Sequence, residues 1–211
     1  GLALLAFLGA GYDHRDGKYK IAVQRGLDWL VKHQRPDGDL FSETGSSPGT
    51  SLYSHGIAAI PLCEAYGMTN DPDLREPARK ALNFITNAQD KRGGWRYAPG
   101  VWSDTSVTGW QMMALKSGEL SGFVVPKSSY EGVSRWLDFA ASGPGGSPSR
   151  YAYLPIEGDR TKLPNIDTWR AVSKVMTAEA LLMRRYLGWD QNNPHMKDGA
   201  DYLMQNLPPR P

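Results

Sequence analysis

The sequence predicts an all-α protein made of about four helix hairpins, each with an inner and an outer helix. Two observations lead to this prediction. Segments that are apolar on nearly all sides alternate with segments that are amphipathic at helical period. A spaced residue pattern also occurs twice, 55 residues apart, at 25–40 and 80–95. Because one such hairpin cannot bury its apolar face alone, we expect the hairpins to stack into a ring or an arc of a ring.

The apolar segments are the predicted inner helices, because a helix that is apolar all round belongs in the middle of a structure. They are Gly1–Gly11, Gly56–Gly67, Gly109–Gly118 and Ala171–Gly188. Each ends in or just after a glycine, a common helix stop. The first is far shorter than the ~20 residues of a membrane span, so we predict a buried helix there and no transmembrane segment. Pro61 predicts a kink in the second, or a later start of that helix.

The amphipathic segments are the predicted outer helices, with one apolar stripe facing the inner layer. They cover Val23–Val31, Ala78–Ala88, Val133–Ala141 and Lys197–Leu207. The alternation of the two kinds of segment predicts one repeat domain over 1–211. Because the chain starts with Gly1 and not with methionine, we expect it to be part of a longer polypeptide.

The repeated pattern places a glutamine and a glycine after each of the first two outer helices. Gln34 is followed by Gly38, and Gln89 is followed by Gly93 and then by Trp95. A glutamine amide can hydrogen-bond the open groups of a helix end, a glycine can adopt positive φ, and a tryptophan can cover both. We therefore interpret these five residues as structural. The third and fourth units lack this combination.

The third unit is longer than the others, and the excess predicts a loop insertion at 142–167. This stretch is rich in glycine and proline and ends in a tyrosine-bearing sequence. A long loop inside a compact domain is usually functional or disordered.

The pattern at 25–40 and 80–95 resembles the QW repeat of the squalene and oxidosqualene cyclases. These enzymes belong to the α/α-toroid superfamily, together with the protein prenyltransferase β subunits. The resemblance implies an α/α toroid, or an arc of one, with ligands bound in the central cavity near the N-terminal ends of the inner helices. It also implies an acidic D-x-D-D-T run whose middle aspartate protonates the substrate. Asp104 and Thr105 match the end of this run, but Ser103 holds the place of the proton donor, so standard cyclase chemistry is not expected.

Composition and the remaining motifs exclude several other functions. Lys and Arg number 24 and Asp and Glu 22, for a net charge of +2, which gives no basis for nucleic-acid binding. The single cysteine, Cys63, excludes an intramolecular disulfide framework and lacks the Asp-x-Cys pair that holds zinc in the prenyltransferases. The histidines show no metal-ligand spacing. We expect neither a metal nor another cofactor.

Candidate functional residues lie at the predicted starts of the inner helices. Asp104 and His55 are candidates for acid–base catalysis, although Asp104 can instead cap a helix and His55 can instead pack. Aromatic rings at a cavity mouth suit isoprenoid chains, carbocations or sugar rings. The predicted ligand-binding residues are Tyr53, Tyr97, Trp102, Trp110, Trp169 and Arg170.

Three hypotheses follow from these features. The leading one is a ligand-binding or scaffold module of the cyclase type that takes an isoprenoid or another apolar molecule, without the acid that drives cyclisation. The alternative is an enzyme, either cyclase-like with Asp104 or carbohydrate-active with residues such as Arg96. A third possibility is protein binding by the outer surface or by the 142–167 loop. An arc would leave apolar ends, so we also expect a homodimer or further repeats.

Overall fold

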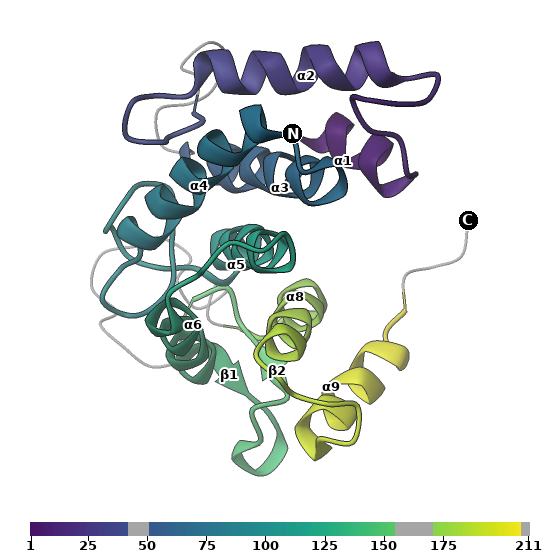
Figure 1. The fold of residues 1–211 in the computed structure, drawn as a ribbon. Coiled ribbons are helices and arrows are strands. Elements are labelled where there is room, and N and C mark those ends of the chain that lie inside the picture. The colour runs from purple at the N-terminus through teal and green to yellow at the C-terminus, as the bar shows by residue number, and fades with distance from the viewer. Residues whose placement is uncertain (42–50, 155–170, 208–211) are drawn as a thin grey trace.

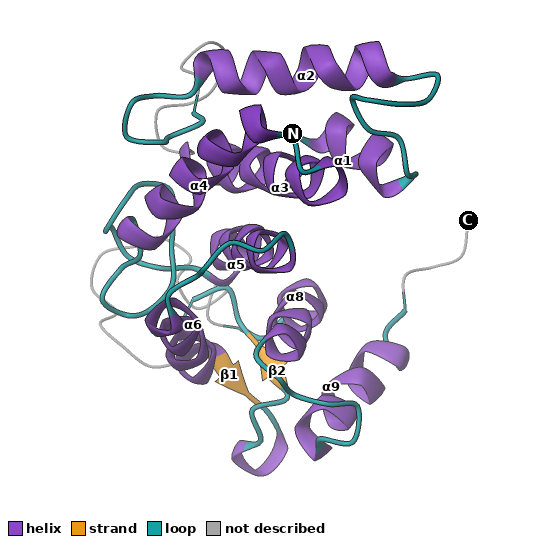
Figure 2. Ribbon diagram, viewed as in Figure 1, coloured by secondary structure: helices purple, strands orange, loops and turns teal. Residues whose placement is uncertain are grey.

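The computed structural model describes residues 1–41, 51–154 and 171–207 (Figure 1). Within these ranges the chain forms eight α-helices and one pair of two-residue strands, which confirms the predicted all-α class (Figure 2). No helix in these ranges is both long enough and apolar enough to cross a membrane.

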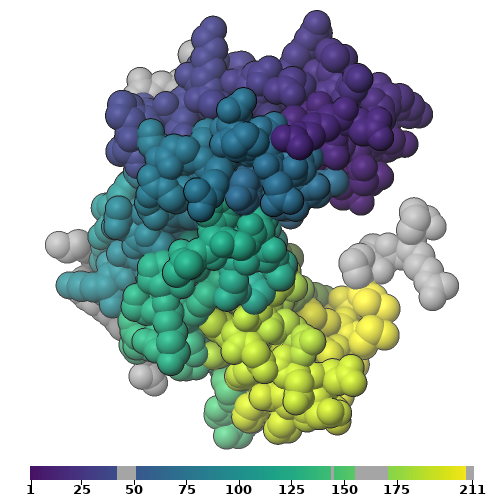
Figure 3. Space-filling view, viewed as in Figure 1, coloured from purple at the N-terminus to yellow at the C-terminus, as the bar shows by residue number. Residues whose placement is uncertain are grey.

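The helices form two layers that alternate along the chain. The inner helices pack against one another in chain order, and they are α1 (Leu2–Gly9), α3 (Ser51–Thr69), α5 (Thr105–Leu120) and α8 (Lys174–Tyr186). Each outer helix packs on the inner helix that precedes it, and they are α2 (Lys20–His33), α4 (Pro72–Asn87), α6 (Lys127–Ala140) and α9 (Pro194–Met204). The described helices follow an open arc with the outer helices on its convex side (Figure 1). The space-filling view shows a recess between the N-terminal and the C-terminal segments (Figure 3).

Two of the inner helices, α3 and α5, begin earlier than their apolar segments. The α3 helix starts at Ser51 and α5 starts at Thr105, whereas the apolar segments start at Gly56 and Gly109. The first turns are polar, but they are held by neighbouring backbone: Leu52 N donates to Tyr97 O and Thr105 N donates to Tyr153 O. The two helices therefore start close to Tyr53 and Asp104, which the sequence placed at the starts of inner helices.

Pro61 lies inside α3 and does not delay the start of that helix. The helix runs without interruption from Ser51 to Thr69, so the later start that the sequence allowed is wrong. Pro61 is buried in the inner layer. Because proline has no backbone N–H, it donates no hydrogen bond to the carbonyl group four residues earlier.

The repeated glutamines tie each turn to the next outer helix. Gln34 Nε2 donates to Gly38 O at 3.1 Å and to Pro77 O of α4 at 2.9 Å. Gln89 Nε2 donates to Gly93 O at 2.7 Å and to Ser129 O of α6 at 3.0 Å. The same amide thus bridges the turn and the following outer helix in both units.

The repeated glycines allow the close approach between these turns and the outer helices. Gly38 has φ +98° and Gly93 has φ +97°, a backbone conformation that L side chains rarely adopt. A Cβ atom at Gly38 would overlap the Lys80 carbonyl, and one at Gly93 would overlap the Gly132 carbonyl. Any other residue would therefore strain the backbone and push the outer helix away.

The third turn keeps the backbone arrangement of the second with different side chains. Trp95 N donates to Thr108 Oγ1 at 3.1 Å, and Trp95 O accepts from Asp104 N at 2.9 Å. In the same way Tyr151 N donates to Thr177 Oγ1 at 3.1 Å, and Tyr151 O accepts from Ser173 N at 3.0 Å. Tyr151 therefore occupies the place of Trp95 in the third unit.

This equivalence narrows the predicted insertion. The strands β1 (Ala141–Ser142) and β2 (Arg150–Tyr151), with the short 3₁₀ turn η1 (Pro144–Gly146) between them, form the third turn itself. Trp95 precedes the helix cap Asp104 by 9 residues, whereas Tyr151 precedes the cap Ser173 by 22. The first part of the predicted 142–167 insertion thus forms the third turn, and a longer connection follows Tyr151. Residues 155–167 lie outside the described residues.

Candidate functional site

The inner helices expose one stripe each, and these stripes form the concave side of the arc. Most accessible residues of α5 follow helical spacing: Ser106, Trp110, Met113, Ser117 and Leu120. The other sides of α5 are covered by α3, α4, α6 and α8. We call the accessible stripes of α1, α3, α5 and α8 together the concave face.

The helices α3, α5 and α8 can be aligned by the equivalent hydrogen bonds to His55, Thr108 and Thr177, and α1 by its 55-residue offset from α3, which arranges the concave face in rows. The first row is Leu2, Ile57, Trp110 and Glu179. The second row is Leu5, Ile60, Met113 and Leu182; it is entirely apolar, and all of it except the buried Ile60 is accessible. Leu2 is 59% exposed and Leu182 is 41% exposed. Apart from Glu179, the middle of the concave face is therefore an accessible apolar surface.

Polar residues border the apolar rows at both helix ends. Tyr53 and Ser106 lie near each other at the N-terminal end. At the C-terminal end Ser117 Oγ donates to Glu64 Oε1 at 3.2 Å. Burial raises the pKa of Glu64 despite this hydrogen bond. A pocket of about 290 Å³ opens there, lined by Glu64, Gly67, Met68, Ser117, Leu120 and Ser121.

Asp104 caps the N-terminus of α5, at the same end of the concave face as Tyr53. Its side chain is fully buried, and Oδ1 accepts from Val107 N at 2.8 Å. Oδ2 accepts from the Tyr153 hydroxyl at 2.9 Å and lies 3.5 Å from Arg96 Nε. The capping alternative from the sequence therefore describes the contacts that Asp104 makes.

Two tyrosines at equivalent places extend this contact toward the concave face. The Tyr97 and Tyr153 hydroxyls lie 2.7 Å apart, and since Tyr153 donates to Asp104, Tyr97 donates to Tyr153. The Tyr97 ring lies 6.1 Å from the Tyr53 ring, and the Arg96 guanidinium lies 4.9 Å from the Tyr97 ring centre. A chain of polar groups thus runs from buried Asp104 to half-buried Tyr53.

Burial dominates the electrostatics of this cluster. It raises the pKa of Asp104 to about 6, although hydrogen bonds from Val107 and Tyr153 and the charge of Arg96 act in the opposite direction. Burial likewise raises the pKa of Tyr153, and the charge of Asp104 adds to the effect. The cluster therefore favours a neutral Tyr153 that donates its proton to Asp104 in a hydrogen bond.

The sequence interpretation missed Glu179. It lies on α8 against Gly109 of α5, whose missing side chain makes room for it. Burial, and next the charge of Asp104, raise the pKa of Glu179 to about 8. One signal in the sequence could have indicated Glu179: it is a charged residue within a predicted inner helix. It lies four residues after Val175 and three before Leu182, so the three side chains share one accessible stripe of the helix.

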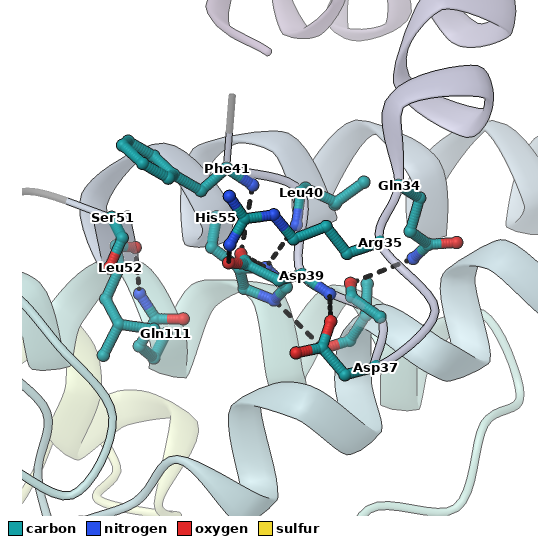
Figure 4. A network of polar contacts seen from close by, with 12 residues as sticks. Gln34, Arg35, Asp37, Asp39, Leu40, Phe41, Ser51, Leu52, His55 and Gln111 are labelled. Carbon is teal, nitrogen blue, oxygen red and sulfur yellow. Dashed lines mark hydrogen bonds and ion pairs between the residues drawn. The ribbon is translucent and has the colours of Figure 1, made fainter. Parts of the chain in front are cut away.

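His55 lies away from the concave face. It is fully buried, and its Nε2 donates to Ala81 O of α4 at 3.1 Å. Its Nδ1 accepts from Leu40 N at 3.1 Å or, when protonated, donates to Asp39 Oδ1 at 3.2 Å (Figure 4). In the next unit Thr108 takes the place of His55, because its Oγ1 accepts from Trp95 N as His55 Nδ1 accepts from Leu40 N. These contacts join a turn to two helices, so we leave His55 out of the candidate site.

The remaining predicted ligand-binding residues divide into three groups. Tyr53, Tyr97 and Trp110 lie in or beside the concave face, as described above. Trp102 is 47% exposed, has φ +51° and packs against the Arg92 guanidinium, 4.5 Å from the ring centre. Trp169 and Arg170 lie outside the described residues. In the part of the chain that the structure describes, no group of three or more His, Cys, Asp and Glu side chains could hold a metal ion.

The geometry defines an all-α protein with an apolar concave face, and known proteins give distant similarities to its sequence. The chain is 28% identical over 117 residues to drimenyl diphosphate synthase of Streptomyces showdoensis, which covers 56% of this chain and 21% of that protein. It is 30% identical over 100 residues to lanosterol synthase of Candida albicans, which covers 45% and 13%. It is also 31% identical over 137 residues to mitochondrial distribution and morphology protein 12 of Penicillium rubens, which covers 61% and 28%.

The chain spans less than a third of the length of each of these relatives. No protein-family model and no solved structure matches it. The similarities to the two synthases support a distant terpenoid cyclase-like relationship. The name of the third relative refers to mitochondrial morphology, so the relationship depends on the first two.

Proposed function

We propose that the protein is a ligand-binding module of the terpenoid cyclase type that holds an apolar small molecule, such as an isoprenoid, on its concave face. The observation that carries this proposal is the pair of accessible rows formed by Leu2, Ile57 and Trp110 and by Met113 and Leu182. Accessible apolar surface of this kind usually marks a binding site. The similarity to two synthases supports the isoprenoid class.

The proposal does not include cyclisation by the standard acid. Ser103, which stands at the place of the proton-donating aspartate in the resemblance, is buried, and its Oγ donates to Asp90 Oδ2 at 3.3 Å. A serine hydroxyl is too weak an acid to protonate an alkene. We also propose that the arc belongs to an α/α toroid, completed by further repeats or by a second copy of the chain.

Thermal melting with a ligand panel tests the binding proposal. A bound ligand at 100 times its Kd stabilises a protein by ~2.7 kcal/mol, and each kcal/mol moves the midpoint of a domain of this size by roughly 2–4 °C. We expect such a shift with farnesol or farnesene and none with an oligosaccharide such as cellohexaose. A shift with the oligosaccharide alone would contradict the proposal and favour a carbohydrate-active protein. No shift with any ligand would favour a scaffold.

Asp104 supports one alternative, a cyclase-like enzyme. Its pKa of about 6 and its hydrogen bond from Tyr153 describe a carboxyl group that can exchange a proton near neutral pH. Incubation with squalene or farnesyl diphosphate followed by product analysis separates the two functions. A cyclic product that disappears in Asp104→Asn would establish the enzyme and contradict the binding module.

A further inference from the structure

Glu179 interrupts an otherwise apolar row of the concave face. At the equivalent place α1 has Leu2, α3 has Ile57 and α5 has Trp110. The residues one turn before and after Glu179 on its own stripe are Val175 and Leu182, which are 70% and 41% exposed. A carboxyl group in such a place loses hydration without gaining the packing of an apolar side chain.

The surroundings of Glu179 are acidic or neutral. Its side chain lies over Gly109 on α5, in the field of the buried Asp104 and within the electrostatic reach of the half-buried Tyr53 on α3. Among the described residues, Glu179 has no hydrogen-bond or ion-pair partner, whereas Asp104 accepts from both a backbone amide and a tyrosine. With a pKa of about 8, Glu179 carries a proton at neutral pH and can both donate and accept a hydrogen bond.

We infer that the concave face selects an apolar ligand that carries an uncharged oxygen group, a hydroxyl or a carbonyl, and that Glu179 is the residue that hydrogen-bonds this group. The inference rests on the proposed function and narrows it. It adds a ligand-binding residue that neither the sequence patterns nor the similarity to known proteins indicates.

The charges around Glu179 explain why the group must be uncharged. A phosphate or diphosphate would place its negative charge beside Asp104 and Glu179, and burying that charge without a cation would be costly. The charge that acts on Glu179 is that of Asp104, and Arg96 lies 3.5 Å from Asp104. A hydroxyl or a carbonyl matches the protonated Glu179 without that cost.

The length of the apolar surface sets the size of the ligand. From Ser106 to Ser117 on α5 is 11 residues, or ~16 Å at the helical rise of 1.5 Å per residue. Glu64 and Ser117 close the far end with a second weakly acidic group and a pocket. An extended chain of farnesol size is comparable to this length.

The test compares three ligands with the same chain: farnesol, farnesyl diphosphate and the hydrocarbon farnesene. Affinities are measured for the wild type, for Glu179→Gln and for Glu179→Ala at pH 6.5 and 9.5, with melting curves to confirm that each variant is folded. Glu76→Gln is the matched control, because Glu76 lies on the convex side in α4 and its side chain is 53% exposed. We expect farnesol to bind the wild type at least about 10-fold more tightly than either other ligand at pH 6.5, since one hydrogen bond to a buried group supplies about that factor.

The pH dependence identifies Glu179 as the group that meets the ligand. At pH 9.5 a group with a pKa of about 8 is ~3% protonated, and an apolar ligand would then have to cover a charged carboxylate, so farnesol affinity should fall by about 10-fold in the wild type and in Glu76→Gln. In Glu179→Gln, whose amide donates at both pH values, affinity should stay constant. In Glu179→Ala, farnesol and farnesene should bind equally.

Four results would overturn the inference. Tighter binding of farnesyl diphosphate than of farnesol would show that the head group is charged. If farnesol affinity fell with pH in Glu179→Gln as it does in the wild type, Glu179 would not be the ligand-binding group. Equal binding of farnesol and farnesene by the wild type would also remove Glu179 from the site while leaving apolar binding in place. Failure of all three ligands to bind would overturn the proposed function and this inference with it.

Discussion

The turns between the outer and inner helices differ from the concave face in how their polar groups are paired. In the turns, Gln34 and Gln89 each donate two hydrogen bonds to backbone, and buried His55 also bonds to neighbouring backbone. On the concave face, Glu179 has no such partner among the described residues. A satisfied buried group stabilises the fold, whereas a weakly hydrated group without a partner is suited to bind a ligand. The two regions should therefore respond to mutation in opposite ways.

The largest loss of stability is expected from a turn glycine. Gly93→Ala should lower the free energy of unfolding by ~3 kcal/mol or more, because φ is positive and the new Cβ would overlap the Gly132 carbonyl. Urea denaturation measures the effect. Gly122→Ala is the control, since Gly122 also has positive φ but nothing lies within 4 Å of its Cβ position. Equal losses in the two variants would show that close approach does not matter.

Glu179 should give stability a pH dependence. Its pKa is higher in the folded protein than the usual value of about 4.3 for an unfolded chain, so the folded state holds the proton more tightly. Its contribution is complete below about pH 4 and is lost as the pH rises through about 8. Glu179→Gln should therefore be more stable than the wild type at pH 9, by between about 1 and 5 kcal/mol. Parallel stability curves for the two proteins from pH 5 to 9 would contradict the environment assigned to Glu179.

Gln89 tests the turn network with a smaller effect. Gln89→Ala removes two hydrogen bonds and should cost ~1–2 kcal/mol of unfolding free energy. The control is Gln24→Ala, since Gln24 is bonded to exposed Asp28 in the same helix. Ligand affinity should not change in either variant. If Gln89→Ala were as mild as Gln24→Ala, the bridge to α6 would not stabilise the arc.

The concave face should show the reverse pattern. Leu182→Asp changes a partly exposed residue, so the free energy of unfolding should move by less than ~0.5 kcal/mol, while farnesol affinity should fall at least about 10-fold. Val124→Asp, at a residue 97% exposed in the α5–α6 connection, is the control and should leave both unchanged. A large loss of stability in Leu182→Asp would mean that this row supports the fold.

The sequence was sufficient to predict the alternation of inner and outer helices and the use of Gln34 and Gln89 as equivalent residues. It was insufficient where the repeat changes its side chains. Tyr151 makes the backbone bonds of Trp95, but nothing in a tyrosine between Arg150 and Ala152 indicates that role, because the bonds belong to the backbone. Glu179 was missed because the row to which it belongs exists only after α3, α5 and α8 are aligned in space.

The central claim is that an apolar ligand lies on the concave face, and photolabelling tests it most directly. A farnesol analogue that carries a diazirine would be irradiated with the wild-type protein, and the labelled residues would be identified by mass spectrometry. The account predicts labels at Ile57, Trp110, Met113 and Leu182 that unmodified farnesol competes away. Labels confined to the outer helices, or labels that farnesol does not reduce, would contradict it.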